Sequence, residues 1–122
     1  MNVEQRRRQK PHRNLAAWQK TMDLAVNIYQ FTSTFPQKET YGLSSQLTRA
    51  AISAPSNIAE GAAGRTRLQF SNFLSNAIGS LNEIDTQLEL ALRLGYVTGT
   101  HYDRLSKRSM NALPLHTGYE RQ

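Results

Sequence analysis

Two rows of polar side chains have the spacing best suited to chemistry in this sequence. Each row recurs at intervals of three or four residues, and the rows are Gln46, Arg49, Ser53, Asn57 and Glu60, then Asn76, Ser80, Glu83 and Gln87. On an α-helix, this spacing places the members of a row on one face. Two facing rows would form a polar site with two carboxylates, the residue type used in acid–base catalysis and in di-metal helical bundles.

A structural interpretation of the two rows is favoured over a catalytic one. Interhelical hydrogen bonds that fix the register of two helices, or a solvated edge on each helix, account for the same spacing. A buried carboxylate without a partner is costly, so Glu60 and Glu83 must reach water or pair with neighbours such as Arg49 or Ser80. We predict a structural polar network of these residues: Gln46, Ser53, Asn57, Glu60, Ser80 and Glu83. Within it, Glu60 should accept hydrogen bonds or pair with an arginine.

Other residues that an enzyme or a metal site would need are missing from the sequence. Di-metal bundle sites use Glu-x-x-His pairs, and the three histidines, His12, His101 and His116, are too widely separated to share a helical face. There is no cysteine and no Gly-x-Ser-x-Gly elbow, and residues 61–64 do not form a phosphate-binding glycine loop. We therefore expect no catalytic residue, no enzymatic activity, no metal and no cofactor.

Basic residues are the other set with a chemical meaning. The 122 residues include 15 Lys plus Arg against 9 Asp plus Glu, a net charge of +6. Five basic residues fall within the first thirteen positions, where Glu4 is the only acid: Arg6, Arg7, Arg8, Lys10 and Arg13. Such a run repels itself and has little to bury, which predicts a flexible basic arm over residues 1–13. This arm suits the phosphate backbone of a nucleic acid.

Basic residues beyond the arm extend this prediction. Arg65 and Arg67 lie at the expected start of a helix, where backbone N–H groups favour anions, and Arg49 lies in a polar row. We predict that these three arginines are secondary nucleic-acid contacts. The alternative is that Arg49 pairs with a carboxylate and the other two are ordinary surface charges. A further cluster, Arg104–Arg108, would add positive charge to the last helix.

The elements that must position these residues are helices. Val plus Ile number only 8 while Ala plus Leu plus Met number 29, a balance that favours helices over sheets. Residues 14–113 are predicted to form one all-α domain, preceded by the arm at 1–13 and followed by an irregular tail at 114–122. No apolar run approaches the ~18 residues that span a bilayer, and no signal-type segment is visible. We expect a cytoplasmic protein without a membrane partner.

Apolar periodicity divides the domain into four helices, three at about 15–32, 39–63 and 66–94, and a weaker fourth that follows the linker at 96–99 and has Tyr102, Leu105, Met110 and Leu113 as its apolar positions. Asn14 and Thr66 are the expected N-terminal caps of the first and third helices, and Gly95 is the expected stop of the third. The core stripe predicted for the first helix is Leu15, Trp18, Met22, Ala25, Tyr29 and Thr32. Short connections imply an antiparallel up-down four-helix bundle. Pro55 should kink helix 2, and Pro114 should keep helix 4 short.

A family resemblance rests on one string that is unusual inside a helix, residues 53–61, which read Ser-Ala-Pro-Ser-Asn-Ile-Ala-Glu-Gly. Further matching residues are Tyr41, Gly42, Leu43, Gln46, Leu47, Arg49, Ala50, Ala51, Phe70, Phe73, Leu74, Gly79, Ser80, Glu83, Gln87, Leu88, Leu94, Gly95 and Tyr96. Together they resemble the bacterial four-helix bundle proteins encoded in 23S rRNA intervening sequences. The sequence is similar also to the accessory variability proteins of diversity-generating retroelements.

The resemblance implies an antiparallel bundle that assembles into a homo-oligomeric ring, a pentamer, with basic surface suited to RNA. It implies no catalytic residues. Two functions follow as expectations. The first is a non-enzymatic RNA-binding bundle that contacts mainly phosphates and has little sequence preference. The alternative is an adaptor or accessory subunit whose partner is a protein, for example a reverse transcriptase. A lean core and a short fourth helix also predict self-association.

Overall fold

The computed structural model describes residues 1–113, and every regular element within them is helical. In chain order the elements are α1 (Val3–Arg8), the short 3₁₀ helix η1 (Pro11–Asn14), α2 (Ala16–Thr32), the 3₁₀ helix η2 (Gln37–Glu39), α3 (Leu43–Ala62), α4 (Arg67–Arg93) and α5 (Gly99–Met110). The predicted all-α class is therefore confirmed for this part of the chain. The predicted irregular tail, residues 114–122, lies outside the described residues.

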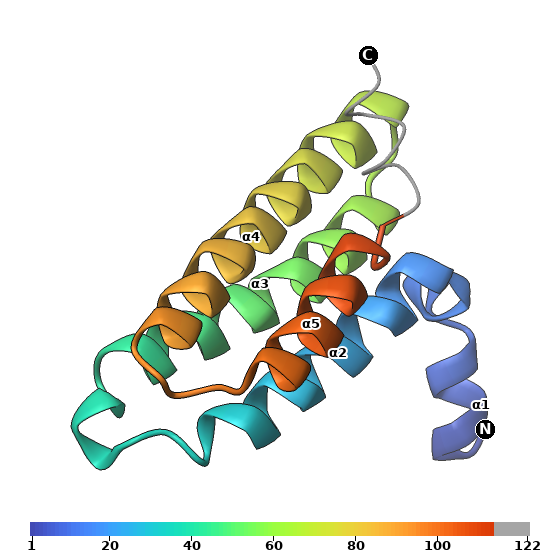
Figure 1. Ribbon diagram of the computed structural model, residues 1–122. Helices are drawn as coiled ribbons and strands as arrows, with labels where there is room; N and C mark the ends of the chain where they lie inside the picture. The colour runs from blue at the N-terminus through green and yellow to red at the C-terminus, as the bar shows by residue number, and fades with distance from the viewer. Residues whose placement is uncertain (114–122) are drawn as a thin grey trace.

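Four of the helices share one core (Figure 1). α2 packs on α3, α3 on α4, α4 on α5, and α5 packs on α2. The largest fully buried aliphatic side chains come from α2, α3, α4 and the residues after α5: Leu24, Ile28, Leu47, Ile58, Leu81, Ile84, Leu88 and Leu113. Each such side chain contributes about 1.5–3 kcal/mol when removed from water, so this core is the main source of stability.

The structure contains the predicted cap and the predicted stop of α4, but it does not contain the predicted cap of α2. Thr66 caps α4 through a capping box, because its hydroxyl accepts from the Gln69 N–H and the Gln69 side chain accepts from the Thr66 N–H. Gly95 ends α4 with a φ of +79°, a conformation that glycine adopts at little cost. The predicted Asn14 cap is wrong. Asn14 is the last residue of η1, and α2 begins after Leu15 without a side-chain cap.

The buried face of α2 also differs from the prediction. The residues inside the core are Thr21, Leu24, Ala25 and Ile28, whereas Met22 and Tyr29 of the predicted stripe are exposed. Both stripes have helical spacing, so periodicity alone could not choose between them. Thr21 tolerates full burial because its hydroxyl donates to the carbonyls of Ala17 and Trp18, at 2.8 and 3.0 Å. Of the predicted stripe, Ala25 therefore lies within the core, whereas Met22 and Tyr29 lie beside it.

α3 continues as one helix through the buried Pro55. Proline has no N–H to offer the Ala51 carbonyl four residues earlier. Among residues 1–113, no side chain donates to that carbonyl; the Asn57 amide instead donates to the carbonyl of Ser53, at 2.8 Å. The helical assignment through Pro55 is confirmed, whereas the predicted kink stays a prediction.

The basic arm contains regular structure that the sequence analysis did not predict. α1 covers Val3–Arg8 and starts with a capping box between Asn2 and Gln5, at 2.8 and 2.9 Å. Every residue of α1 is exposed, and the helix projects from the end of the four-helix core (Figure 1). η1 then packs on α3 and joins the arm to the core.

α5 is short, as predicted, and the chain after it completes the core. The helix begins at the Thr98 cap and ends at Met110. Leu105 and Ser109 are buried, and the next two apolar residues, Ala112 and Leu113, are 0% and 1% exposed. The predicted core position Met110 is exposed, because helical spacing from Leu105 reaches Ser109 on the inner face.

Candidate nucleic-acid interface

The cations of α1 form the outermost part of the interface. Arg6, Arg7 and Arg8 are consecutive and exposed, so they point in different directions around the helix. Glu4 partly neutralises them through ion pairs with Arg7, at 3.3 Å, and Arg8, at 3.9 Å. These pairs lie at the surface, where they are screened and weak. The arginines are therefore free to exchange this carboxylate for phosphate.

Arg13 joins the arm to α2 through an aromatic contact. Its guanidinium lies 5.0 Å from the centre of the Trp18 ring, and the His12 ring meets the same indole edge-on at 4.9 Å. Burial, followed by the nearby charges of Arg13 and Lys10, lowers the pKa of His12 below its ordinary value of 6.5. Burial and the two neighbouring cations thus both disfavour the protonated, positively charged form of His12.

A second group of cations lies where α5 packs against α2, and we call it the basic seam. Its members are Lys20, Arg104, Lys107 and Arg108. Lys107 pairs with Asp103, at 3.0 Å. Within residues 1–113, neither Arg104 nor Arg108 has a carboxylate within ion-pair distance. The sequence placed three of these cations in a cluster on one helix, but Lys20 joined them only through the packing of α2 on α5.

Three adjoining hollows connect the basic seam with the arm. The first, about 280 Å³, contains Arg104 and Arg108, and the second, about 260 Å³, contains Arg108, Lys107 and Lys20. The third, about 450 Å³, lies between the arm and the start of α2 and shares Asp23 with the second. The three hollows thus follow one another along α2, and their cations outnumber the two carboxylates that also line them, Glu4 and Asp23.

The three arginines predicted as secondary contacts do not lie together. All three are exposed. Arg49 is in the first half of α3, whereas Arg65 and Arg67 are at the turn between α3 and α4. At 1.5 Å per residue, the helix separates Arg49 from this turn by roughly 20 Å. None of them lines the three hollows of the seam and arm.

Half of the predicted polar network forms. The Ser80 hydroxyl donates to the Ser53 hydroxyl across α4 and α3, at 2.8 Å, and the Asn57 amide donates to the same oxygen, at 3.1 Å. Gln46, Glu60 and Glu83 are instead exposed, and their side chains make no hydrogen bond or ion pair among residues 1–113. The prediction that Glu60 accepts hydrogen bonds or pairs with an arginine is therefore not met within the described residues, where its carboxylate is exposed. Only the residues that face the neighbouring helix became a network.

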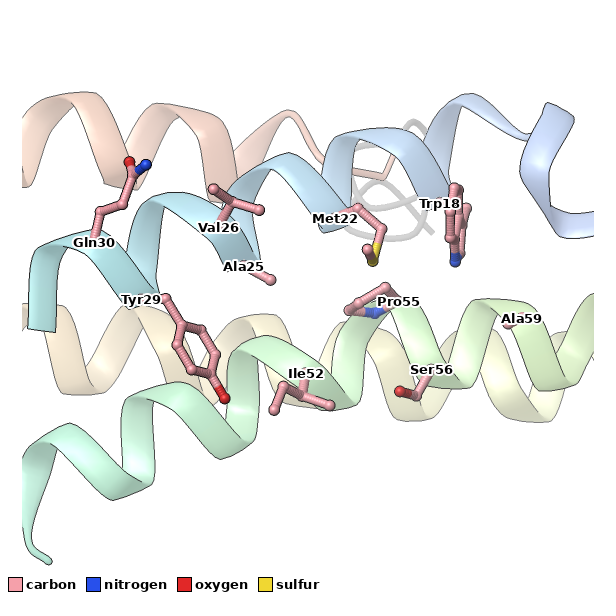
Figure 2. A pocket seen from close by; sticks show the side chains of 10 residues that line it. All are labelled: Trp18, Met22, Ala25, Val26, Tyr29, Gln30, Ile52, Pro55, Ser56 and Ala59. Atoms are coloured by element: carbon pink, nitrogen blue, oxygen red, sulfur yellow. The ribbon is translucent and has the colours of Figure 1, made fainter. Parts of the chain in front are cut away.

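An apolar groove lies on the side of α2 that faces α3 (Figure 2). Its volume is about 520 Å³, and its lining consists of Trp18, Met22, Ala25, Val26, Tyr29, Gln30, Ile52, Pro55, Ser56 and Ala59. Val26, Tyr29 and Ile52 are about half exposed, at 53%, 50% and 48%. Contiguous exposed apolar side chains of this kind mark interaction surfaces. The mispredicted core stripe of α2 supplies much of this groove.

At one end of the core, a hydrogen-bonded link that the sequence analysis did not predict joins the α2–α3 connection to the α4–α5 connection. The Glu39 carboxylate accepts from the Leu43 N–H, at 3.1 Å, and from the Tyr96 hydroxyl, at 2.8 Å. It thereby caps the start of α3 and holds the segment between α4 and α5. The two residues are 57 positions apart, so no local pattern could have revealed the pair.

We expect Tyr96→Phe to lower the free energy of unfolding in a pH-dependent way. The Leu43 N–H and then the Tyr96 hydroxyl lower the pKa of Glu39 below 4.5, so this stabilisation is present above that pH and is lost as the pH falls through the lowered pKa. The Glu39 bond raises the pKa of Tyr96 above 10.0, so its contribution is lost as the pH rises through the raised value. Denaturant titrations should show a difference between variant and parent at neutral pH that shrinks in acid. In a Glu39→Gln background, Tyr96→Phe should have a smaller effect; an equal effect would contradict the link.

Among residues 1–113, no three His, Asp or Glu side chains come together as a metal-binding group. Within the same residues, no helix is both long and apolar enough to cross a bilayer.

Comparisons with known proteins agree on one family. A family model described as 23S rRNA-intervening sequence protein matches residues 13–115. Among solved structures, the chain resembles a protein of unknown function from the S23 ribosomal protein family of Bacteroides thetaiotaomicron, with a TM-score of 0.76 and 25% identity over 87% of this chain and 96% of the other. Comparison with curated proteins found no match. The resemblance predicted from residues 53–61 is confirmed: the chain belongs to the 23S rRNA-intervening sequence protein family.

Proposed function

We propose that this protein is a non-enzymatic RNA-binding protein that holds the phosphate backbone along its basic seam and arm. The observation that supports the proposal most directly is the run of adjoining hollows from Arg104 to the arm, in which cations outnumber carboxylates. Phosphate contacts of this kind give affinity without sequence preference. Arg7 and Arg8 of α1 line the last hollow, where a bound strand would leave the core.

The proposal extends to the assembly of the chain. We infer that the four packed helices form an antiparallel up-down bundle and that copies associate into a homo-oligomer, the pentameric ring that the family resemblance implies. The apolar groove supports association, because Met22, Val26, Tyr29 and Ile52 are exposed on one surface. A ring would also multiply the basic seams and so raise the avidity for one RNA molecule.

Binding across a salt series tests the RNA proposal. Fluorescence anisotropy of the full-length protein with labelled single-stranded and duplex RNA should show binding at low salt that weakens steeply towards physiological salt. Each neutralised phosphate contributes about 0.7 to the slope of log affinity against log salt for single strands and about 0.9 for duplexes. Absence of binding to both RNAs at low salt would overturn the proposal.

The apolar groove also supports a second candidate function, that of an adaptor for a protein partner such as a reverse transcriptase. The mass of the protein in solution distinguishes self-association through the groove from binding of another protein there. A monomer at micromolar concentration leaves the groove free for another protein, and complex formation with that protein should depend little on salt because the contacts are apolar.

A further inference from the structure

The cleft between the second half of α2 and the first half of α5 combines cations with aromatic rings and free amides. Its lining includes Asn27, Gln30, Phe31, His101, Arg104 and Arg108. We infer that this cleft binds one unpaired nucleotide of single-stranded RNA, with the phosphate on Arg104 and Arg108 and the base against Phe31 and His101. The inference rests on the proposed function and adds to it a preference for unpaired RNA.

The two arginines suit a phosphate. Arg104 and Arg108 are four residues apart, so they lie on the same face of α5, and both are exposed. Among residues 1–113, no carboxylate lines the cleft. The nearest acid in sequence, Asp103, already pairs with Lys107, at 3.0 Å. Guanidinium groups that no acid of this part of the chain neutralises, held four residues apart, can bind phosphate oxygens through paired hydrogen bonds.

The aromatic residues suit a base. The rings of Phe31 and His101 lie 5.1 Å apart at 88°, so they form a corner between α2 and α5. Tyr96 lines the same cleft. Its hydroxyl donates a hydrogen bond to Glu39, so Tyr96 offers a base only its ring. A base that stacks on such rings must be unstacked from a duplex, because the neighbouring bases of a duplex cover both of its faces.

The polar side chains and the volume of the cleft favour the binding of a single nucleotide. Within residues 1–113, the side-chain amides of Asn27 and Gln30 make no hydrogen bond, so both can pair with the edge of a base. The cleft measures about 280 Å³, close to the lower limit of ~300 Å³ for small-molecule pockets. The strand would then continue along the basic seam through Arg108, which also lines the next hollow.

Competition between a short oligoadenylate and an RNA duplex tests the cleft in the full-length protein. The double variant Arg104→Gln/Arg108→Gln should lower oligoadenylate affinity by roughly tenfold or more, beyond the loss in the matched control Lys38→Gln/Arg93→Gln. The control removes the same charge from two exposed cations that line none of the three hollows. His101→Ala, at an exposed position, should weaken oligoadenylate binding and leave duplex binding unchanged.

A titration with adenosine 5′-monophosphate adds a readout that charge loss alone cannot explain. NMR signals of the Asn27 and Gln30 side-chain amides and of the His101 ring should shift on addition of the nucleotide, and inorganic phosphate should not shift the amides. If wild-type protein binds neither RNA, the proposed function fails and the cleft with it. If it binds RNA but the double variant matches its control, or His101→Ala weakens both RNAs equally, only the nucleotide cleft is overturned.

Discussion

Deletion of residues 1–10 is expected to lower RNA affinity about 100-fold near 0.1 M salt. The deletion removes four cations and Glu4, a net charge of +3. Three fewer phosphate contacts would reduce the salt slope by about 2 for single-stranded RNA, which corresponds to this loss. Helical content of the core should not change, because every one of these ten residues is exposed and η1, which packs on α3, stays in place.

The charge-matched control for this deletion is the triple variant Arg49→Gln/Arg65→Gln/Arg67→Gln. It removes the same net charge from exposed positions that lie outside the three hollows. Anisotropy titrations at several salt concentrations should show a smaller loss for the triple variant than for the deletion. Equal losses would mean that RNA responds only to the net charge of the protein, and the seam and arm would then have no special role.

Replacing Ile52 by glutamate is expected to convert the proposed homo-oligomer to monomers. Ile52 lies in the apolar groove and is 48% exposed, so the monomer tolerates a polar side chain there. In an oligomer, the same carboxylate would be buried against apolar groups at a cost of several kcal/mol per ion, which weakens association by at least 100-fold. Light scattering at micromolar concentration measures the change in mass directly.

Leu90→Glu is the matched control for this substitution. Leu90 has the same exposure, 48%, and the same charge change, but it lies on α4 and outside the groove. Its mass should equal that of the parent protein. A parent protein that is already a monomer would contradict self-association, and equal dissociation by both variants would place the interface elsewhere.

The core residues of α3 and α4 were predictable because, in these helices, the apolar residues with helical spacing are also the buried ones. On α4 the apolar residues that recur every three or four positions from Leu74 to Ala91 are buried, and Phe70, one turn earlier, is partly buried against the core. The α3 residues with the same spacing are buried too: Leu43, Leu47, Ala51, Ala54 and Ile58. Both helices lie against neighbours on their apolar sides. α2 differs because apolar residues occupy two adjacent stripes. Only its packing between α3 and α5 selected Leu24 and Ile28 for the core and left Met22 and Tyr29 outside.

The candidate site was predictable only in part, for a similar reason. The sequence revealed the arm and the cluster on the last helix, since both are local runs of charge. It also suggested a network around Ser53, yet Glu60 and Glu83 proved to be exposed. A side chain three or four residues from a buried one can still lie at the edge of a helix interface, where water competes for it.

By itself, the sequence determined the helical class, the ends of α4 at Thr66 and Gly95, the uninterrupted helix through Pro55, and the family. Each of these depends on neighbouring residues, on caps and on periodic apolar side chains. The tertiary structure alone decided that Lys20 joins the cations of α5, that Phe31 meets His101, and that Tyr96 reaches Glu39. Contacts between distant segments depend on how helices rotate about their axes as they pack, and a rotation of one residue moves a different row of side chains to the surface.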